Sequence, residues 1–563
     1  MMRHALHALL ALLFAVPLSA GNLDPARPNV IVIYYDDMGW GDMGANVASE
    51  FAVPEGSKYL EAGAKSLTPY LDALAAQGMR FTNGHSADGV CTPSRYALMT
   101  GRYCWRTWLK RGVTGGYSPS LMQPDEFTVG KMFQKQGYRT AMVGKWHIGM
   151  EFQDREGNAV KIPKYSAEVL AKDQIDFSRP VLDTPMHTSG FDYFFGTSAS
   201  LDMPPYAWLE TRGDDVHLLV DGALVIEGEV DFTQGRVAMN ADLDERKGLR
   251  EEIQAFARDG VIDPTFVFAD YLQIQAAKVA EVIAEREADG QPFFIYVPMP
   301  APHTPHTVQP EFVGSAGWTY GDYVVQTDYY TGKIIEALGD PADPKRLAAN
   351  TVVFVTSDNG PENIAYHSSL ENNHDANGPY AGRKRDSYEG GTRVPFVVRW
   401  PGVAEPGSVT DHLCWQGDII PTLAEHLGVE LGEREAPDAE SFLPVLRGQA
   451  MPEGRRQAII QHSSRGQFAI VEHTGRWKLI DGTGGGGNKT TGDADNQETL
   501  VAGTLRGEPK QLFDLKADPG ERENLLKNPS PSVQKTAKDL YNLLNQIRGD
   551  AEWGTDGSSW PDR

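Results

Sequence analysis

Cysteine is scarce in this sequence, which has three, Cys91, Cys104 and Cys414, in 563 residues. An odd number of thiols excludes complete pairing, so at least one has no disulfide partner within the chain. If Cys91 is used for chemistry, Cys104 and Cys414 are left to pair or to stay free. We predict a Cys104–Cys414 disulfide, which requires the fold to bring their Cα atoms within about 7 Å of each other.

Basic residues are fewer than acidic ones. The 52 Lys and Arg residues against 76 Asp and Glu residues give a net charge of −24. Such an acidic chain argues against nucleic acid and against an anionic membrane surface as partners. An anionic substrate would have to bind at a local cluster of cations, set against an unfavourable overall field.

Long apolar runs are missing after the first twenty residues. One short run, residues 5–16, follows Arg3 and His4, and "PLSA" then leads into Gly21. This is the layout of a secretory signal peptide, and the run is short for a membrane span. We therefore predict a signal peptide over residues 1–20, a secreted or periplasmic protein, and no membrane contact after the peptide is removed.

Short β-branched and aromatic runs alternate with helical patterns along the chain. Buried strands are predicted at Asn29–Tyr35, Arg139–Val143, Pro292–Val297, Thr351–Ser357 and Pro395–Trp400. Helices are predicted over residues 68–78, 266–287, 323–338 and 418–427. This alternation predicts an α/β fold with a large mixed, mostly parallel sheet sandwiched by helices.

The pattern changes near Gln457. The runs "AIIQHSS", "QFAIVEH" and "RWKLID" predict short antiparallel strands, and residues 532–548 an amphipathic helix. We predict a large domain over residues 21–435, a linker rich in Glu, Pro and Gly over residues 436–456, and a smaller α+β subdomain over residues 457–563. Residues from about 153 to 263 carry weak periodicity and are expected to form insertions over the edge of the site.

Polar residues follow four of the predicted strands at the point where each strand ends. In chain order they are Asp36 and Asp37, Lys145 and His147, His303 and His306, and Asp358 and Asn359. In open α/β sheets, ligands bind beyond the carboxyl ends of the strands. Four such placements predict a functional site at one edge of the sheet.

The residue types at this edge indicate metal-assisted chemistry. Asp36, Asp37, Asp358 and Asn359 offer hard oxygen ligands, which suit Ca²⁺ or Mg²⁺ rather than zinc. Because Ca²⁺ takes about six to eight oxygens, these four residues leave room for oxygens of a substrate and a nucleophile.

Cations and histidines complete the predicted site. Positive charge comes from Arg95, Lys145 and Lys384, and we expect Lys384 to be an exposed loop cation. His147 and His303 are candidates for general acid and base work. A structural role is favoured for three further histidines, His306, His367 and His374. A metal, several cations and two histidines match the hydrolysis of a sulfate or phosphate ester.

The stretch "VCTPSRYALMTGRY" puts Cys91 at a turn just before a helix. Thr92 is the expected N-cap, Pro93 suits the first helical position, and Gly101 suits the position just past the end. Backbone N–H groups and the helix dipole favour negative charge at such a place. A small buried apolar residue and a nucleophile, or its precursor, both fit this position.

The same stretch resembles the signature of type I sulfatases, C-x-P-S-R followed by x-x-L-x-T-G-R. Other motifs that match this family are "DDMGWGD", "GKWHIG", "APHTPH", "SDNG", "GRK…EGGTRVP" and "LFDLKADPGERENL". The resemblance covers nearly the whole mature chain and implies the alkaline-phosphatase-like sulfatase fold. It also implies that a formylglycine-generating enzyme oxidises Cys91 to formylglycine during export.

The resemblance implies a role for each residue of the site. Hydrated formylglycine is a gem-diol, and one of its oxygens, coordinated to a single Ca²⁺ ion, attacks sulfur. The implied metal ligands are Asp36, Asp37, Cys91, Asp358 and Asn359. Lys145, Lys384 and His303 hold the sulfate, and His303 protonates the leaving alcohol. Arg95 and the metal stabilise the diol, and His147 takes the proton whose loss expels sulfate.

Substrate identity is less constrained. The region around Cys91 and Lys145 is most similar to sulfatases acting on galactose-type 6-sulfates, including N-acetylgalactosamine 6-sulfate, so sulfated polysaccharides or oligosaccharides are the expected substrates. Arg383 and Tyr388 depart from the family pattern and are expected to line the substrate subsite. The candidates for stacking on sugars are Trp105, Trp108, Tyr206 and Trp208, with ordinary packing as the alternative.

Two other functions stay open. One is a phosphate or phosphonate monoester hydrolase of the same superfamily. Such phosphatases typically use a Ser or Thr nucleophile and two metals with extra histidine ligands, whereas these motifs supply ligands for one metal. The other is a catalytically inactive binder of sulfated glycans in which Cys91 stays a thiol.

Overall fold

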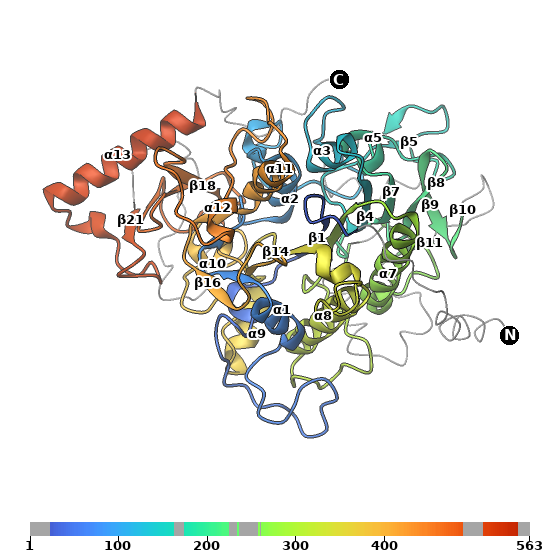
Figure 1. Ribbon diagram of the computed structural model, residues 1–563, viewed down its shortest axis with the longest axis horizontal. Helices are drawn as coiled ribbons and strands as arrows, with labels where there is room; N and C mark the ends of the chain where they lie inside the picture. The colour runs from blue at the N-terminus through green and yellow to red at the C-terminus, as the bar shows by residue number, and fades with distance from the viewer. Residues whose placement is uncertain are drawn as a thin grey trace.

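The computed structural model describes residues 23–160, 162, 174–224, 233–235, 257–258, 260–487 and 511–549. The predicted signal peptide over residues 1–20 lies outside the described residues. Figure 1 shows a large sheet through the middle of the molecule with helices on both sides, and a smaller sheet beside helix α13 (Pro531–Arg548) at one end.

The large sheet has eleven strands within the described residues. In spatial order these are β10 (Ala223–Leu224), β9 (Asp215–Val220), β8 (Leu209–Arg212), β7 (Tyr193–Thr197), β4 (Arg139–Lys145), β13 (Phe293–Pro298), β1 (Asn29–Tyr35), β14 (Thr351–Ser357), β15 (Phe396–Arg399), β2 (Met79–Phe81) and β16 (Ser408–Thr410). Strands β7, β4, β13, β1 and β14 form a parallel centre. Antiparallel pairings flank it on both sides, through β8 and β9 and through β15 and β2. The predicted α/β fold with a large mixed sheet is confirmed.

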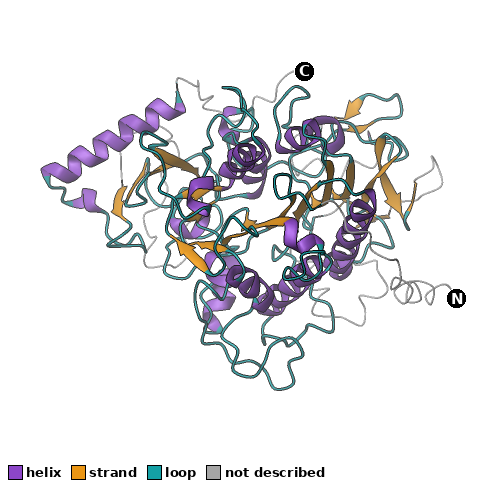
Figure 2. Cartoon of the chain, in the orientation of Figure 1, coloured by secondary structure: helices purple, strands orange, loops and turns teal. Residues whose placement is uncertain are grey.

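The two faces of this sheet are both covered by helices. On β1, Ile31 and Ile33 pack on one side, and Val30 and Val32 pack on the other. The first face is covered by α1 (Pro69–Ala76), α7 (Tyr271–Asp289) and α8 (Thr319–Glu336), and the second by α2 (Cys91–Thr100), α3 (Val129–Lys135) and α11 (Ile419–Leu427). Figure 2 shows these helices on either side of the strands. Burial on both faces explains why the central strands read as continuous apolar runs.

The expectation that residues 153–263 form insertions over the site is wrong for part of this region. Strands β7, β8, β9 and β10 extend the large sheet, and β7 pairs in parallel with β4. Strand β7 has the sequence YFFGT and is buried along nearly its whole length. A short strand buried on both faces has no polar alternation, so periodicity alone cannot identify it. The same region also contributes the ribbons β5 (Phe152–Gln153) with β6 (Ala159–Val160), and β11 (Thr233–Gly235) with β12 (Gly260–Ile262).

A second, four-stranded antiparallel sheet lies near the C-terminus, as predicted. Its strands are β18 (Ala458–His462), β19 (Phe468–Glu472), β20 (Trp477–Ile480) and β21 (Gln511–Asp514). Leu540 and Leu544 of α13 belong to its apolar core. The division into domains stays a prediction. Within the predicted linker, Phe442 is buried, as are Leu443 and Leu446 of α12 (Leu443–Leu446), in the apolar core of the large sheet.

Buried ion pairs join this small sheet to the large one. The Nζ atom of Lys478, on β20, lies 2.8 Å from Glu389 Oε1 and 2.9 Å from Glu521 Oε1, and the Lys478 side chain is fully buried. Glu389 is the first residue of α10 (Glu389–Thr392) and also pairs with Arg393 at 2.6 Å. The loop that carries Lys384 is therefore tied at Glu389 to the C-terminal sheet.

The predicted Cys104–Cys414 disulfide is wrong. All three cysteines are free and buried. Cys104 Sγ lies 3.8 Å from Thr107 Oγ1 and 3.9 Å from Leu109 O. The prediction came from a count of thiols and from the expected compartment, and neither fixes a distance between two residues. For the residues that are described, none of the helices combines the length and apolar character needed to cross a membrane.

Candidate active site

The ends of β1 and β14 bring four oxygen-bearing side chains together. Asp36 and Asp37 follow β1, and Asp358 and Asn359 follow β14, its parallel neighbour. The Asp37 N–H donates to Asp358 Oδ1 at 3.1 Å, and Asn359 Nδ2 donates to Asp37 Oδ1 at 2.7 Å. All four residues are fully buried. Asp37 has a positive φ of 66°, a conformation that non-glycine residues rarely adopt and that clusters at functional sites.

Cys91 lies against this group. Its Sγ is 3.4 Å from Asp36 Oδ1, and the residue is 2% exposed. The helix begins two residues earlier than predicted, because Cys91 is the first residue of α2 and Val90 is the N-cap. Thr92 is therefore not the cap, and its Oγ1 instead contacts Thr114 Oγ1 at 3.2 Å. Cys91 sits in the first turn of a helix, where free backbone N–H groups favour negative charge.

Three buried cations pair with the three carboxylates. Lys145 Nζ lies 2.5 Å from Asp36 Oδ2, and Lys384 Nζ lies 2.6 Å from Asp37 Oδ2. Arg95 Nη2 lies 2.8 Å from Asp358 Oδ2 and 3.5 Å from Asp36 Oδ1.

The expectation of an exposed Lys384 is wrong. Lys384 is 4% exposed, because its loop folds back over the strand ends and its backbone N–H donates to Pro361 O at 3.0 Å.

Burial and the neighbouring charges perturb the titration of this cluster. Burial raises the pKa of the Cys91 thiol well above its usual value, and Asp358 adds to the effect. Burial alone would raise the pKa of the Asp36 carboxyl, but Lys145, His303 and Arg95 outweigh it and hold this pKa well below its ordinary value. For Asp358, burial and the charge of Asp36 outweigh Arg95 and raise the pKa to about 7. The Cys91 thiol is thus protonated at neutral pH, which makes it a poor nucleophile.

His147 follows β4 and has one ring nitrogen available. Its Nε2 lies 2.9 Å from Thr114 O, and since a carbonyl only accepts, Nε2 carries the proton. Within the described part of the chain, the buried Nδ1 has no hydrogen-bond partner. Burial, and then Lys145 and Arg95, hold the pKa of His147 well below its usual value. The neutral ring can therefore accept a proton at Nδ1.

His303 lies beside Asp37. Its Nδ1 is 2.5 Å from Thr304 O, and its Nε2 is 3.6 Å from Asp37 Oδ2. Ser200 Oγ links this histidine to Lys145, since it accepts from Lys145 Nζ at 3.0 Å and lies 3.4 Å from His303 Nδ1.

Sequence reasoning missed Ser200. It lies three residues beyond the end of β7, where the strand-end rule would have found it if β7 had been recognised.

The donor set fits a hard divalent cation. Asp36, Asp37, Cys91 and His303 each offer an atom, and these atoms lie within 4.8 Å of one another. Next to them, the buried Oδ1 of Asn359 has no hydrogen-bond partner among the described residues, while its Nδ2 is used by Asp37 and Gly360. A buried carbonyl oxygen without a donor beside two carboxylates suits Ca²⁺ or Mg²⁺, which take oxygen ligands.

The remaining candidates are histidines and aromatic residues. His374 is buried and bonded to Asp42 Oδ1 at 2.8 Å and to Ser49 Oγ at 2.5 Å, which agrees with the structural role favoured for it. Trp105 and Tyr206 are 3% and 1% exposed, so ordinary packing holds for both and the stacking interpretation is wrong for them.

Trp208 stacks on Phe195 at 4.6 Å between ring centroids and is partly buried, and Trp108 is partly buried against the large core. His306 is buried, and His367 is half-buried on α9 (Asn363–Glu371) beside Tyr366. Tyr388 is buried and donates to Gln511 Oε1 at 2.8 Å, and the Arg383 guanidinium lies 5.8 Å from the Tyr366 ring centroid.

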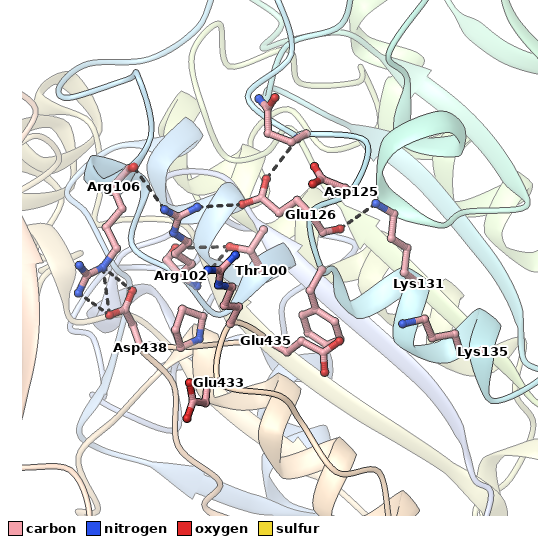
Figure 3. A pocket seen from close by; sticks show the side chains of 14 residues that line it. Thr100, Arg102, Arg106, Asp125, Glu126, Lys131, Lys135, Glu433, Glu435 and Asp438 are labelled. Atoms are coloured by element: carbon pink, nitrogen blue, oxygen red, sulfur yellow. Dashed lines mark hydrogen bonds and ion pairs between the residues drawn. The ribbon is translucent and has the colours of Figure 1, made fainter.

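A surface pocket of about 830 Å³ lies at the far end of α2, and its lining includes none of the predicted site residues. Figure 3 shows that charged side chains of both signs line it, and two of the cations are paired, Arg106 with Asp438 and Arg102 with Glu126. Carboxylates lie among the cations of this lining and lower its attraction for an anion.

The strand-end cluster, with buried cations beside oxygen ligands for a metal, defines a hydrolase of anionic esters, and comparison with known families narrows this class. A family model described as Sulfatase matches residues 28–429. The chain therefore belongs to the sulfatase family. It is an enzyme that hydrolyses sulfate esters.

Individual relatives agree with this assignment. The chain is 31% identical over 540 residues to an N-acetylgalactosamine-6-O-sulfatase of Bacteroides thetaiotaomicron, covering 93% of each chain. It is 30% identical to arylsulfatase A of Bos taurus, covering 94% of this chain and 89% of the relative. A solved structure described with the metabolism of multiple glycosaminoglycans by Bacteroides thetaiotaomicron is 28% identical, with a TM-score of 0.70, covering 93% of this chain and 99% of that one.

Proposed function

We propose that this sulfatase removes 6-sulfate groups from galactose or N-acetylgalactosamine units of sulfated polysaccharides or oligosaccharides. The proposal includes export of the chain, oxidation of Cys91 to formylglycine by a formylglycine-generating enzyme, and one Ca²⁺ ion. The observation that carries the mechanism is the meeting of Cys91, the Asp36–Asp37 pair and three buried cations at one edge of the sheet.

The charge of the cluster supports a metal. Arg95, Lys145 and Lys384 are balanced by Asp36, Asp37 and Asp358, so these six side chains sum to zero when all are ionised and stay close to neutral when Asp358, with its pKa of about 7, is partly protonated. A sulfate ester is an anion and gains little from a neutral site. A bound Ca²⁺ ion would supply two positive charges next to the reacting group, with Asp36, Asp37, Asp358, Asn359 and residue 91 as its ligands.

The state of the Cys91 thiol supports its modification. A buried thiol whose pKa is raised well above the ordinary value gives little thiolate at neutral pH. Formylglycine at this position would supply an oxygen nucleophile instead. Arg95, one turn further along α2, holds Asp358 with two donors and so fixes this carboxylate beside Asp37.

Lys145, Lys384 and His303 are positioned to bind the sulfate. Both ammonium groups and the His303 ring border the same Asp36–Asp37 pair. Fixed cations around the sulfuryl oxygens stabilise the charge that develops there in the transition state. His303 Nε2, with Nδ1 against the Thr304 carbonyl, is the proposed donor of the proton to the leaving alcohol.

His147 is the proposed base of the second step. Its Nδ1 has no hydrogen-bond partner among the described residues, its Nε2 donates to Thr114 O, and its depressed pKa keeps the ring neutral. It accepts the proton whose removal from residue 91 releases sulfate and restores the aldehyde.

The relatives support the choice of substrate. Similarity to an N-acetylgalactosamine-6-O-sulfatase extends over 93% of both chains. Arg383 precedes Lys384 in the loop over the strand ends, and we propose that it contacts the sugar beyond the sulfate.

A panel of defined esters tests this proposal. The 6-sulfates of galactose and N-acetylgalactosamine are compared with their 4-sulfate isomers and with the matching 6-phosphates, with Cys91→Ala as control. We expect sulfate release from the 6-sulfates only. Equal kcat/KM on the phosphates would favour the phosphatase alternative. Binding of the 6-sulfates without turnover, by protein carrying formylglycine at position 91, would favour the inactive glycan binder.

A further inference from the structure

Arg385, the residue after Lys384, has a left-handed backbone with φ of +84°. Glycine adopts this conformation without strain, whereas a side chain with a Cβ atom is disfavoured there. Strained residues of this kind persist where the surroundings over-determine the backbone, and they cluster at functional sites. The Arg385 side chain must therefore contribute something that glycine would not.

The backbone of Arg385 is held independently of its side chain. Its N–H donates to Gly89 O at 2.6 Å, and its carbonyl accepts from the Ser464 N–H at 3.0 Å. A Cβ atom added at Gly487 would lie 2.1 Å from the Arg385 carbonyl oxygen, so this glycine also packs tightly against it. Replacing the side chain should leave this conformation in place.

The Arg385 guanidinium is committed to one carboxylate. Its Nη1 donates to Glu362 Oε1 at 2.5 Å, and its Nη2 donates to Glu362 Oε2 at 2.6 Å. The same Oε2 lies 3.7 Å from Lys384 Nζ, beyond hydrogen-bond distance, while Lys384 Nζ is bonded to Asp37 Oδ2 at 2.6 Å. The carboxylates of Asp37 and Glu362 thus compete for the Lys384 ammonium group. Arg385 binds Glu362, which is the more distant of the two.

We propose that Arg385 is a positioning residue for Lys384. By engaging both oxygens of Glu362 in a bidentate pair, it prevents this carboxylate from capturing the Lys384 ammonium. The ammonium then stays directed at Asp37 and at the sulfate. Only this last point, the binding of sulfate by Lys384, rests on the proposed function.

Arg385→Gly tests this role cleanly, because it removes the guanidinium and also relieves the backbone strain. The thermal unfolding midpoint should fall, because Glu362 loses its bidentate partner, while relief of the backbone strain offsets part of the loss and the protein stays folded. We expect kcat/KM to fall by about 10- to 100-fold, since a displacement of about 1 Å of a positioned group can cost about 10²-fold. Asp221→Gly is the matched control. It relieves a positive φ of 49° in the turn after β9, at the sheet edge, and should leave kcat/KM unchanged.

The decisive variant is the double substitution Arg385→Gly with Glu362→Gln. Removing the competing charge should restore most of the activity that Arg385→Gly alone loses. A merely structural ion pair predicts that the second change restores the unfolding midpoint alone, with the kcat/KM of the folded protein the same in all three proteins. Wild-type kcat/KM in Arg385→Gly, or no recovery in the double variant, would overturn the proposal.

Labelling of Lys384 separates this inference from the proposed function. Trace acetylation with acetic anhydride, followed by peptide mass spectrometry, reports the reactivity of the Lys384 amine without turnover. We expect the extent of Lys384 acetylation to change in Arg385→Gly, because the ammonium exchanges Asp37 for Glu362, and to return to the wild-type level in the double variant. This pattern in a protein that releases no sulfate would overturn the proposed function alone. Unchanged labelling in Arg385→Gly would overturn the positioning role.

Discussion

Replacing Lys384 by alanine should affect both stability and catalysis. The Lys384 side chain is 5% exposed, its Nζ lies 2.6 Å from Asp37 Oδ2, and the Asp37 side chain is fully buried. Removing one partner of a buried ion pair leaves an uncompensated charge and costs about 3–5 kcal/mol. Because Lys384 is also a proposed transition-state donor, kcat/KM should fall by about 10²–10³-fold.

Calcium should reduce the loss of stability. A divalent cation beside Asp37 supplies the positive charge that the Lys384→Ala variant lacks, so the variant should depend on the metal more than the wild type does. The difference in Tm between variant and wild type should therefore be larger in chelator than in excess Ca²⁺. Lys535→Ala is the control, because Lys535 pairs with Asp539 on the exposed face of α13 and should contribute little.

Two measurements check this reasoning. Calorimetry of both variants with Ca²⁺ and with chelator gives the stability difference, and steady-state kinetics on a 6-sulfated sugar gives kcat/KM. A Tm gap of equal size in the two buffers would refute the idea that a metal and Lys384 share the charge of Asp37. A wild-type rate in Lys384→Ala would refute its catalytic role.

Three further predictions concern the metal and the cysteines. Chelation should abolish turnover, and Ca²⁺ should restore it better than Zn²⁺, because the proposed ligands are mainly oxygens; full activity in metal-free protein would remove Asp36, Asp37, Asp358 and Asn359 from this role. Protein made with a formylglycine-generating enzyme should react with an aminooxy reagent at the peptide of residue 91 alone, and activity should track the labelled fraction; a fully active protein with an intact Cys91 thiol would contradict the mechanism. Denatured, unreduced protein that carries formylglycine at position 91 should show two titratable thiols, Cys104 and Cys414. Finding no free thiol in it would support the Cys104–Cys414 disulfide after all.

Much of the site could be predicted because strand ends are readable in the sequence. Asp36, Lys145 and Asp358 each close or follow a run of β-branched and aromatic residues, and parallel packing brings such ends to one edge. The buried, continuous runs of β1 and β14 made this edge identifiable before any distance was known.

The wrong and missed predictions have a common physical origin, because local sequence patterns do not specify long-range contacts. Lys384 looked exposed because its loop is polar and rich in glycine, yet its partner Asp37 lies 347 residues away in the chain. Ser200 was missed because β7 shows no alternation. The Glu362–Arg385 pair leaves no motif at all, and only the positive φ of Arg385 draws attention to it.

The ion pair between Lys478 and Glu389 has a consequence for how the enzyme is made. Glu389 lies five residues after Lys384, and its buried partner Lys478 comes nearly ninety residues later in the chain. A nascent chain that ends before β20 would leave this carboxylate with Arg393 and the more distant His85. The loop that carries Lys384 can therefore reach its final conformation only after the C-terminal sheet has been synthesised. A chain truncated after residue 429, where the family match ends, should be inactive even though it keeps every proposed catalytic residue.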